Sequence, residues 1–552
     1  RKAYFVGSGI GSLSAAFFLI RDAGFKGEDI IILEELAATG GSMDGAGNPK
    51  DGYICRGGRM LNQPVYECLQ EMMKDVPSIT KEGQSVYQDI MDFFVDHKTN
   101  VQNRLITLNG QTCDVSTMGF CQRDRMELLA LSLASEKQIG TSVISDWFSP
   151  DFFKTNFWFM WQTTFAFQMW SSAIELKRYM HRFMHEFVRI ETLEGVMKTP
   201  FNQYESLALP LQIFLQKNKT QIKFGCSVKN VLINESTGKY TAQQIIYVED
   251  GKEKQIKLSP QDLCFIQNGC MTDSSSIGSH TEAATLKTSK DATSFGLWQK
   301  IADQHPGKFG NPEPFYKNVN ESMWQSFTLT CDNILWEQLC KQLKCKTHGL
   351  ITTLRDANWL FTFSLVFQPH FRNQPDNVKV VWGYCLYPNR LGNYVKKSML
   401  ECTGQEILYE LCQHLRIAKE YVGDAICKPC IMPFITSQFQ PRKVEDRPLP
   451  VPVGATNFGF ISQYVEIPND VVFTVEYSVR AAQMAVYKLL DIKKKIPKIN
   501  RYDLNPIVLF KSLIKSYKYG SGVAARRGKN TQKKVIIAGI VVAAVAIFMK
   551  FK

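Results

Sequence analysis

The stretch "KAYFVGSGIGSLSAAFFLI", residues 2–20, decides the fold of this chain. It has the order of a dinucleotide-binding βαβ unit: a short apolar strand, a glycine-rich turn and a helix rich in small residues. Gly7 suits the tight turn, and Gly9 lets the backbone approach a pyrophosphate. Ser12, beside Gly11, stands where the usual pattern has its third glycine. The stretch therefore predicts a Rossmann-like α/β fold.

A second strand follows in "DIIILEE", residues 29–35, and ends on an acid. Glu34 lies about 20 residues past the glycine turn, where a carboxylate accepts hydrogen bonds from the ribose hydroxyls. Two more glycine clusters, "TGGSMDGAG" and "GYICRGGRM", follow soon after. Because several loops wrapped around one extended cofactor are typical of flavin sites, FAD is favoured over NAD.

The composition limits the possible partners and compartment. The chain has 552 residues, enough for two or three domains, and a net charge of +13. Its basic residues gather toward the C-terminus, which favours a membrane surface over nucleic acid. The 15 scattered cysteines indicate reduced thiols in an intracellular protein, without a disulfide frame or a zinc site. No metal is predicted, and the choice between monomer and homodimer stays open.

An apolar run near the C-terminus, "VIIAGIVVAAVAIFM", occupies residues 535–549 between lysines. At about 1.5 Å per residue it is shorter than the ~30 Å hydrocarbon core, although flanking lysines can snorkel. The run predicts a tail anchor; the alternative is a helix packed on the protein or lying in the membrane interface. We therefore expect a membrane-associated protein facing the cytosol, either tail-anchored or peripheral.

Aromatic side chains are concentrated in residues 146–170, "DWFSPDFFKTNFWFMWQTTFAFQMW". One helix face cannot hide so many rings against an ordinary core. Since each buried methylene contributes about 0.8 kcal/mol, an aromatic-lined tunnel suits a long acyl chain. The alternative is a buried helical hairpin. The segment contains charged residues and is not a transmembrane span.

Specific motifs occur along nearly the whole chain, to about Tyr487. They are "GSGIGSL", "GGSMDGAG", "GYICRGGRM", "ELKRYMHRF", "FNQYES", "NGCMTDSSSIGS", "FQPHF" and "FISQYVEIPNDVVFTVEYSVRAAQ". In these motifs the chain resembles the oleate hydratase family of FAD proteins, also called the myosin-cross-reactive antigen family. The resemblance implies addition of water across the cis-9 double bond of oleate to give 10-hydroxystearate, without net redox change.

The resemblance assigns the proton donor to Tyr179 of "ELKRYMHRF". His181 and His185 on the same helix could share a metal, but no third ligand is apparent, so a packing role is favoured. Many family members carry a water-positioning glutamate after "RGGR", where this chain has Met60. We expect backbone groups of the 56–60 loop, or the flavin, to hold the water instead; loss of hydratase activity is the alternative.

The substrate carboxylate is expected at polar side chains carried over from the family. Gln203, Ser364 and His370 match this set, whereas Val366 stands where an asparagine is common. An imidazolium at His370 would pair with a buried carboxylate. Tyr204, in the "FNQYES" motif, is also expected to bind the substrate, and it is the nearest alternative hydroxyl to Tyr179 in the sequence.

The resemblance also implies the contacts to FAD. They include Val228, on a strand that binds adenine in related flavoproteins, and Thr474, where the chain returns late to the cofactor. The complete expected set is Gly7, Gly9, Gly11, Ser12, Glu34, Gly41, Ser42, Arg56, Gly58, Arg59, Val228 and Thr474.

The domain organisation follows from these contacts. We expect a discontinuous FAD-binding domain from residues 1–65, 200–280 and 425–490. Largely helical substrate-binding domains would comprise 66–199 and 281–424, and the basic C-terminal region 491–552. Two other functions stay open: a flavin oxidoreductase acting on a lipid, and a non-catalytic FAD-containing lipid-binding membrane protein.

Overall fold

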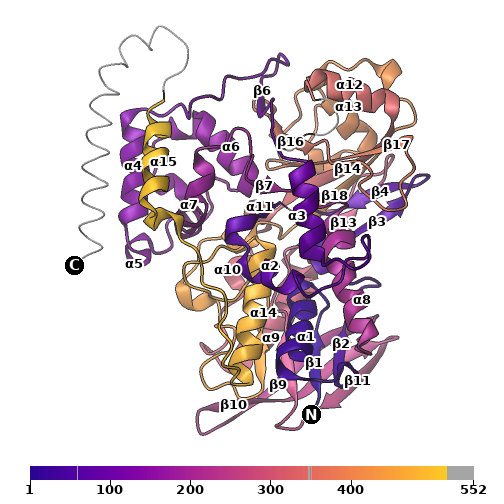
Figure 1. The fold of residues 1–552 in the computed structure, drawn as a ribbon, viewed down its shortest axis with the longest axis vertical. Helices are drawn as coiled ribbons and strands as arrows, with labels where there is room; N and C mark the ends of the chain where they lie inside the picture. Colours follow the sequence, from indigo (N-terminus) through magenta and orange to yellow (C-terminus); the bar gives the residue numbers. More distant parts are fainter. Residues whose placement is uncertain (59, 346–348, 350, 519–552) are drawn as a thin grey trace.

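A computed structural model describes residues 1–58, 60–345, 349 and 351–518 of the chain. Figure 1 shows a lower lobe around a parallel sheet, an upper lobe around a second sheet, and a group of helices to one side. Arg59 and the apolar run 535–549 lie outside the described residues, so the tail anchor stays a prediction. No helix within the described part is long and apolar enough to cross a bilayer.

The opening stretch forms the predicted strand, turn and helix. Strand β1 (Ala3–Val6) is buried along its whole length, as expected for a central parallel strand covered on both faces. Helix α1 (Ile10–Ala23) follows and ends at Gly24, whose left-handed backbone satisfies the last turn. Strand β2 (Ile30–Leu33) pairs parallel to β1. The α/β Rossmann-like fold is therefore confirmed.

The parallel sheet gathers strands from three distant parts of the chain. Its order is β19-β12-β1-β2-β8, with every pairing parallel. The distant strands are β8 (Gln221–Lys223), β12 (Leu263–Ile266) and β19 (Phe458–Phe460). They fall within the segments expected for the FAD-binding domain; the domain boundaries themselves stay a prediction.

A seven-stranded sheet forms the upper lobe and is antiparallel except where β15 meets β6. Its order is β13 (Ser276–Ile277), β18 (Ile426–Met432), β14 (Trp324–Asp332), β17 (Val378–Cys385), β16 (Phe361–Ser364), β15 (Thr352–Leu354) and β6 (Leu105–Ile106). Smaller sheets join β9 (Cys226–Ser236), β10 (Lys239–Glu249) and β11 (Lys252–Lys257), then β3 (Gly45–Asn48) with β4 (Gly52–Cys55), and β5 (Leu61–Asn62) with β7 (Val196–Met197).

Helices cover the sheets and form the lateral group. The lateral group contains α4 (Gln122–Leu133), α5 (Glu136–Ile139), α6 (Asn156–Phe165), α7 (Ala173–Phe187) and α15 (Pro506–Ser516). The other helices are α2 (Glu67–Met73), α3 (Val86–Asp96), α8 (Leu209–Lys217), α9 (Thr293–Gln304), α10 (Glu313–Tyr316), α11 (Val319–Ser322), α12 (Asn333–Gln342), α13 (Gly404–Leu415) and α14 (Val475–Leu489).

A buried ion cluster ties α7 to the parallel-sheet lobe. Arg182 of α7 binds Glu67 at 2.9 Å and Asp470 at 3.1 Å. Arg480 of α14 binds the same two carboxylates, each at 3.0 Å. Arg182 and Asp470 are both 0% exposed, so breaking the cluster would leave an uncompensated buried charge. The cluster therefore sets the position of α7 against the loop that precedes α14.

The cysteines are all free thiols. Cys427 and Cys430 have the spacing of a CxxC motif, but they lie on β18. Side chains three residues apart on a strand point to opposite faces, so this pair is unsuited to share a metal or to form a disulfide. Within the described residues no group of three or more metal-ligating side chains occurs.

We expect Gly11→Ala to lower the free energy of unfolding by about 1–3 kcal/mol. A methyl group at Gly11 would lie 2.1 Å from the carbonyl oxygen of Ile461, which is backbone and cannot step aside easily. Urea denaturation measures the change. Gly296→Ala in α9 is the matched control: its added methyl meets nothing within 4 Å, so this variant should be unchanged or more stable. Equal stability of both variants would contradict the close packing of α1 against the backbone at Ile461.

Candidate active site

Two glycine loops meet where α1 begins. The Gly40 N–H donates to the Ser8 carbonyl at 3.0 Å, and a methyl group at Gly41 would lie 3.2 Å from the Gly9 Cα. Gly7 and Gly41 have backbone φ angles of +84° and +55°, which residues other than glycine rarely adopt. The loops form a cradle at a helix N-terminus, where free N–H groups favour an anion such as a pyrophosphate.

Glu34 follows β2 and faces a cavity of about 320 Å³, here called the nucleotide cavity. Its carboxylate accepts hydrogen bonds from the Ser8 N–H at 2.7 Å and from the Leu36 N–H at 2.8 Å. These bonds fix the carboxylate at the end of the strand. Val228 of β9 lines the same cavity, so the structure brings together these two residues expected at the ribose and the adenine.

A smaller cavity of about 50 Å³, the bridging cavity, continues from the nucleotide cavity past Gly9 and Gly41. Gln267 lies between the two and donates to the Ser12 hydroxyl at 3.3 Å. Sequence reasoning missed Gln267. It follows β12 directly, and residues just past the carboxyl ends of parallel strands line the ligand crevice, so its position could have revealed it.

The bridging cavity meets a third cavity, the apolar cavity, at Val475. The apolar cavity measures about 150 Å³. Three cavities in a row match the extended shape of a dinucleotide with a further ligand beyond it. The apolar cavity brings together predicted residues from separate segments: Gly58, Met60, Tyr179, Gln203, Ser364, His370 and Thr474.

The remaining cofactor residues lie around the cradle. Arg56 lines the nucleotide cavity and binds Asp44 at 2.6 Å. Ser42 lines the bridging cavity beside Gly11. Thr474 caps α14, because its hydroxyl accepts from the Tyr477 N–H at 3.2 Å.

Tyr179 lies on the face of α7 that lines the apolar cavity, and it is 1% exposed. Its hydroxyl donates to the Val472 carbonyl, which holds the ring against the loop before α14. Phe165 and Phe167 each meet the Tyr179 ring edge-on, with 5.0 Å between ring centroids. The hydroxyl is therefore presented from a rigid aromatic setting.

Met60 brings no charge into the apolar cavity, but a carboxylate lies nearby. Glu186 of α7 lines the cavity and accepts from the Asn62 side chain at 2.7 Å. Burial alone would raise the pKa of Glu186, yet hydrogen bonds from His185 and Arg189 lower this pKa to about 2. Glu186 is therefore an anion throughout the physiological range, held by its own partners.

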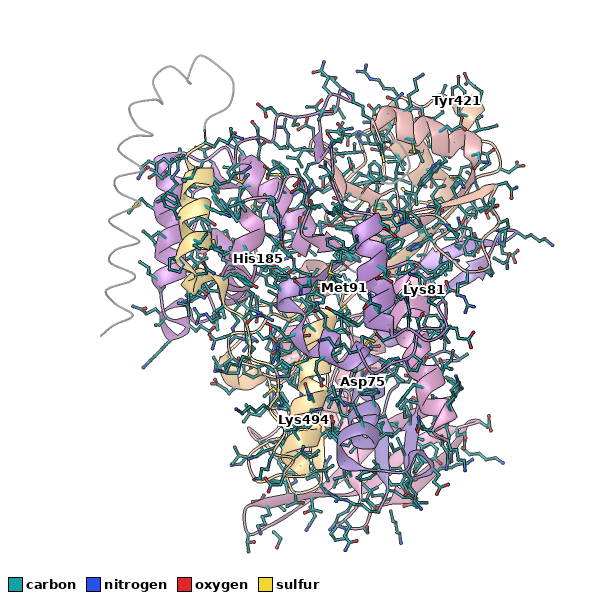
Figure 2. All side chains as sticks on the ribbon, viewed as in Figure 1. Asp75, Lys81, Met91, His185, Tyr421 and Lys494 are labelled. Carbon is teal, nitrogen blue, oxygen red and sulfur yellow. The ribbon has the colours of Figure 1, made fainter. Side chains whose placement is uncertain are left out.

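The two histidines of α7 have separate partners. The His181 ring contacts the Ser132 hydroxyl at 3.3 Å, and the His185 ring contacts the Asn62 amide at 3.2 Å. Figure 2 shows His185 on the inner side of the lateral helices, toward the middle of the molecule. These contacts explain both rings as part of the packing.

The expected carboxylate-binding residues are polar but uncharged. Burial lowers the pKa of His370 to about 4, which favours a neutral ring at pH 7. The expected pairing of an imidazolium with the substrate carboxylate stays a prediction. Gln203 donates to the Gly57 carbonyl, and the Ser364 hydroxyl donates to the Gly349 carbonyl at 3.1 Å. Lys198 also lines the apolar cavity, and burial lowers its pKa to about 8.

Tyr204 lies outside the lining of the apolar cavity. Its hydroxyl donates to Gln212 at 3.3 Å, and its ring lies against Gly40 of the cradle. The structure therefore places Tyr204 behind the cofactor loops rather than near the expected substrate.

The aromatic segment 146–170 forms a packed core more than a tunnel. Phe148 and Phe152 stack with 4.0 Å between centroids, and Trp158 and Trp161 are each 1% exposed. Phe165 is the one ring of this segment that lines the apolar cavity. The other aromatic walls come from elsewhere, mainly Trp324, Trp382, Tyr384 and Phe473, because the facing strands and loops supply them.

Comparison with known proteins identifies the family. The model of the MCRA family matches residues 1–487. This chain belongs to the MCRA family. It is 36% identical over 535 residues to an oleate hydratase of Streptococcus pyogenes serotype M49 (strain NZ131), an alignment that covers 94% of this chain and 89% of the relative. It is 31% identical over 566 residues to a linoleate hydratase of Lactiplantibacillus plantarum, with 94% and 98% covered.

The fold of this MCRA-family chain also occurs in a solved structure of putrescine oxidase, a double mutant from a redesign of cofactor binding. The two share 12% identity and a TM-score of 0.51, over 89% of this chain and 99% of that one. At this identity the likeness concerns the fold alone.

In this MCRA-family chain, Glu186→Gln should lower the free energy of unfolding at pH 7 by about 2–4 kcal/mol, because buried donors lose a charged acceptor. The folded-state pKa of Glu186 is depressed, so its stabilisation is fully present above about pH 4.5 and is lost as pH falls toward 2. Urea denaturation at decreasing pH should show that the difference in free energy of unfolding between the parent protein and Glu186→Gln becomes smaller.

Glu194→Gln is the matched control, since Glu194 is exposed and makes no ion pair among the described residues. This variant should change stability by less than about 0.5 kcal/mol at every pH. A pH-independent loss in Glu186→Gln would contradict the assigned ionic role.

Proposed function

We propose that this MCRA-family protein is a fatty acid hydratase that adds water across the double bond of an unsaturated fatty acid. One observation carries the proposal: Tyr179 lines the same apolar cavity as Gln203, Ser364 and His370. A proton donor and a polar carboxylate end, joined by apolar walls, suit a long acyl chain with an isolated alkene. The oleate and linoleate hydratase relatives support this chemistry, and cis-9 is the position we expect.

The cradle fits FAD. Gly9 and Gly41 leave room for a pyrophosphate at the start of α1, Glu34 lies at the ribose end, and Val228 at the adenine end. FAD would be held by Gly7, Gly9, Gly11, Ser12, Glu34, Gly41, Ser42, Arg56, Gly58, Val228 and Thr474, with its ring toward the apolar cavity. When bound, it supplies a planar polar wall and electrostatic stabilisation without net redox change.

Hydration begins with proton transfer. The Tyr179 O–H bond breaks as a C–H bond forms at one alkene carbon, and a water oxygen bonds to the other carbon. The water then releases one proton, which restores the tyrosine hydroxyl, so atoms and charge balance. The hydroxyl must first leave the Val472 carbonyl.

The walls of the apolar cavity suit the cationic character of this transition state. Trp324 and Tyr384 lie 4.5 Å apart between ring centroids, and their π faces attract positive charge. With Met60 in place of a carboxylate, the nucleophilic water depends on neutral polar groups. The hydroxyl of Tyr66, which donates to the Met60 carbonyl at 3.0 Å, is one such group.

A non-catalytic lipid-binding role is the second candidate, and specific residues favour it. Met60 and Val366 both replace polar groups common in the family, which weakens water and carboxylate positioning. The oxidoreductase alternative has support from the fold alone. Membrane association through residues 535–549 stays a prediction, as do intracellular location and oligomeric state.

We expect the purified protein, supplied with FAD and a reductant, to convert oleate or linoleate into a product heavier by one water. Mass spectrometry detects the product, and its fragmentation locates the hydroxyl. Absence of any hydrated product from either acid, with flavin bound and reduced, would favour the lipid-binding candidate.

Tyr179→Phe keeps the ring packing and removes the proton, so turnover should fall about 10²- to 10⁴-fold while fatty acid binding changes little. Tyr384→Phe is the matched control, because Tyr384 also lines the cavity and also donates to a backbone carbonyl, that of Thr163. Its turnover should stay within a few-fold of the parent. A large loss of turnover in Tyr384→Phe but not in Tyr179→Phe would assign the proton donor to Tyr384 instead.

Gly9→Val should abolish FAD binding, because a side chain there would lie 2.7 Å from the Gln267 amide and fill the cradle. The flavin absorbance of the purified variant measures the effect. Gly296→Ala, remote from the cradle, should retain the parent spectrum. A full flavin spectrum in Gly9→Val would show that the cofactor binds elsewhere.

A further inference from the structure

Lys198 is a cation inside an apolar cavity. It directly follows β7, whose pairing with β5 brings it to the wall of the apolar cavity. Among the described residues that line this cavity, Lys198 is the one lysine or arginine. Its ammonium group makes no hydrogen bond or ion pair within the described part of the chain. Because an unpaired cation in apolar surroundings is costly, its presence indicates an anionic ligand.

Lys198 lines the apolar cavity together with Ser364, and Cys345 influences the charge of one and lies near the hydrogen-bond partner of the other. Ser364 donates to the Gly349 carbonyl at 3.1 Å, and a methyl group at Gly349 would lie 3.7 Å from the Cys345 sulfur. The Cys345 thiol in turn acts electrostatically on the Lys198 pKa. Lys198 and Ser364 both line the apolar cavity.

A backbone hydrogen bond links His370 to the segment that carries Lys198. The Asn202 N–H donates to the His370 carbonyl at 2.9 Å, which anchors the segment running from Lys198 to Gln203 against the loop after β16. The amine, the hydroxyl, the amide and the imidazole thus come from residues that all line the apolar cavity.

Lys198 differs in charge from the other polar residues that line the apolar cavity. Gln203 and Ser364 are neutral by nature, and burial lowers the pKa of His370, which favours a neutral ring at pH 7. Glu186 also lines the cavity, but it is an anion and would repel a carboxylate. A fatty acid carboxylate entering this cavity would therefore find one available positive charge among the described residues.

We propose that Lys198 is the counter-ion that binds the carboxylate of the fatty acid. The inference rests on the proposed function for its substrate class. Lys198 fixes one end of the acyl chain, so it also fixes which carbon reaches Tyr179. It makes the site selective for free acids over neutral lipids of the same length, which the neutral polar residues alone would not do.

Lys198→Met tests the proposal by equilibrium binding of oleate and of oleyl alcohol to the FAD-loaded protein. The dissociation constant for oleate should rise roughly 10- to 100-fold, since a charged hydrogen bond is lost. The constant for oleyl alcohol should stay within a few-fold, because the methionine keeps the apolar volume. Lys198→Arg should recover most of the affinity for oleate.

Lys257→Met on the exposed strand β11 is the matched control and should bind both ligands as the parent does. Unchanged oleate binding by Lys198→Met would overturn the proposal, and so would equal weakening of both ligands, which indicates a packing role. A parent protein that binds no oleate would overturn it as well. If Lys198→Met misfolds, Lys198→Gln takes its place in the same comparison.

Because binding is measured without turnover, the two proposals fail separately. A parent that binds oleate through Lys198 but hydrates nothing would refute the hydratase and retain the carboxylate site. A parent that hydrates oleate, combined with unchanged oleate affinity in Lys198→Met, would retain the hydratase and refute the carboxylate site.

Discussion

The ion cluster of Arg182 and Arg480 with Glu67 and Asp470 is the constraint on which the site depends. It joins α7, α2 and the loop before α14, and three of its four side chains are buried. Removing one partner would strand a buried charge at a cost of about 3–5 kcal/mol. Because Tyr179 stands one helical turn from Arg182 and its hydroxyl donates to the Val472 carbonyl, the cluster fixes the position of Tyr179 in the wall of the apolar cavity.

The apolar cavity needs this rigidity because its chemistry relies on few polar groups. Proton transfer to an alkene has no substrate handle to guide it, so the donor and the acyl chain must be held in register. Aromatic walls supply apolar area and stabilise positive charge, whereas Met60 supplies neither a base nor a hydrogen bond from its side chain. Binding of the fatty acid carboxylate at Lys198 would then contribute more to positioning the alkene than it does in a site with a water-binding carboxylate.

Sequence reasoning predicted the nucleotide half of the molecule better than the substrate half. Gly7, Gly9 and Glu34 occur within one βαβ unit, so short-range pattern was enough to place them together. The aromatic segment 146–170 was harder to interpret, because ring-rich sequence is equally compatible with a tunnel and with a packed core. Most of its rings proved to stack on one another, and distant strands supplied the walls of the cavity.

The amino-acid sequence was enough to predict the Rossmann-like fold, the family and the identity of each residue carried over from it, including the exchange to Met60. These features are local or lie within single motifs, so they need no knowledge of contacts. Only the folded chain shows that His370 is buried, that Lys198 lines an apolar cavity and that Tyr204 lies behind the cofactor loops. Each depends on burial by segments far apart in the chain, and burial changes both the cost of a charge and the partners within its reach.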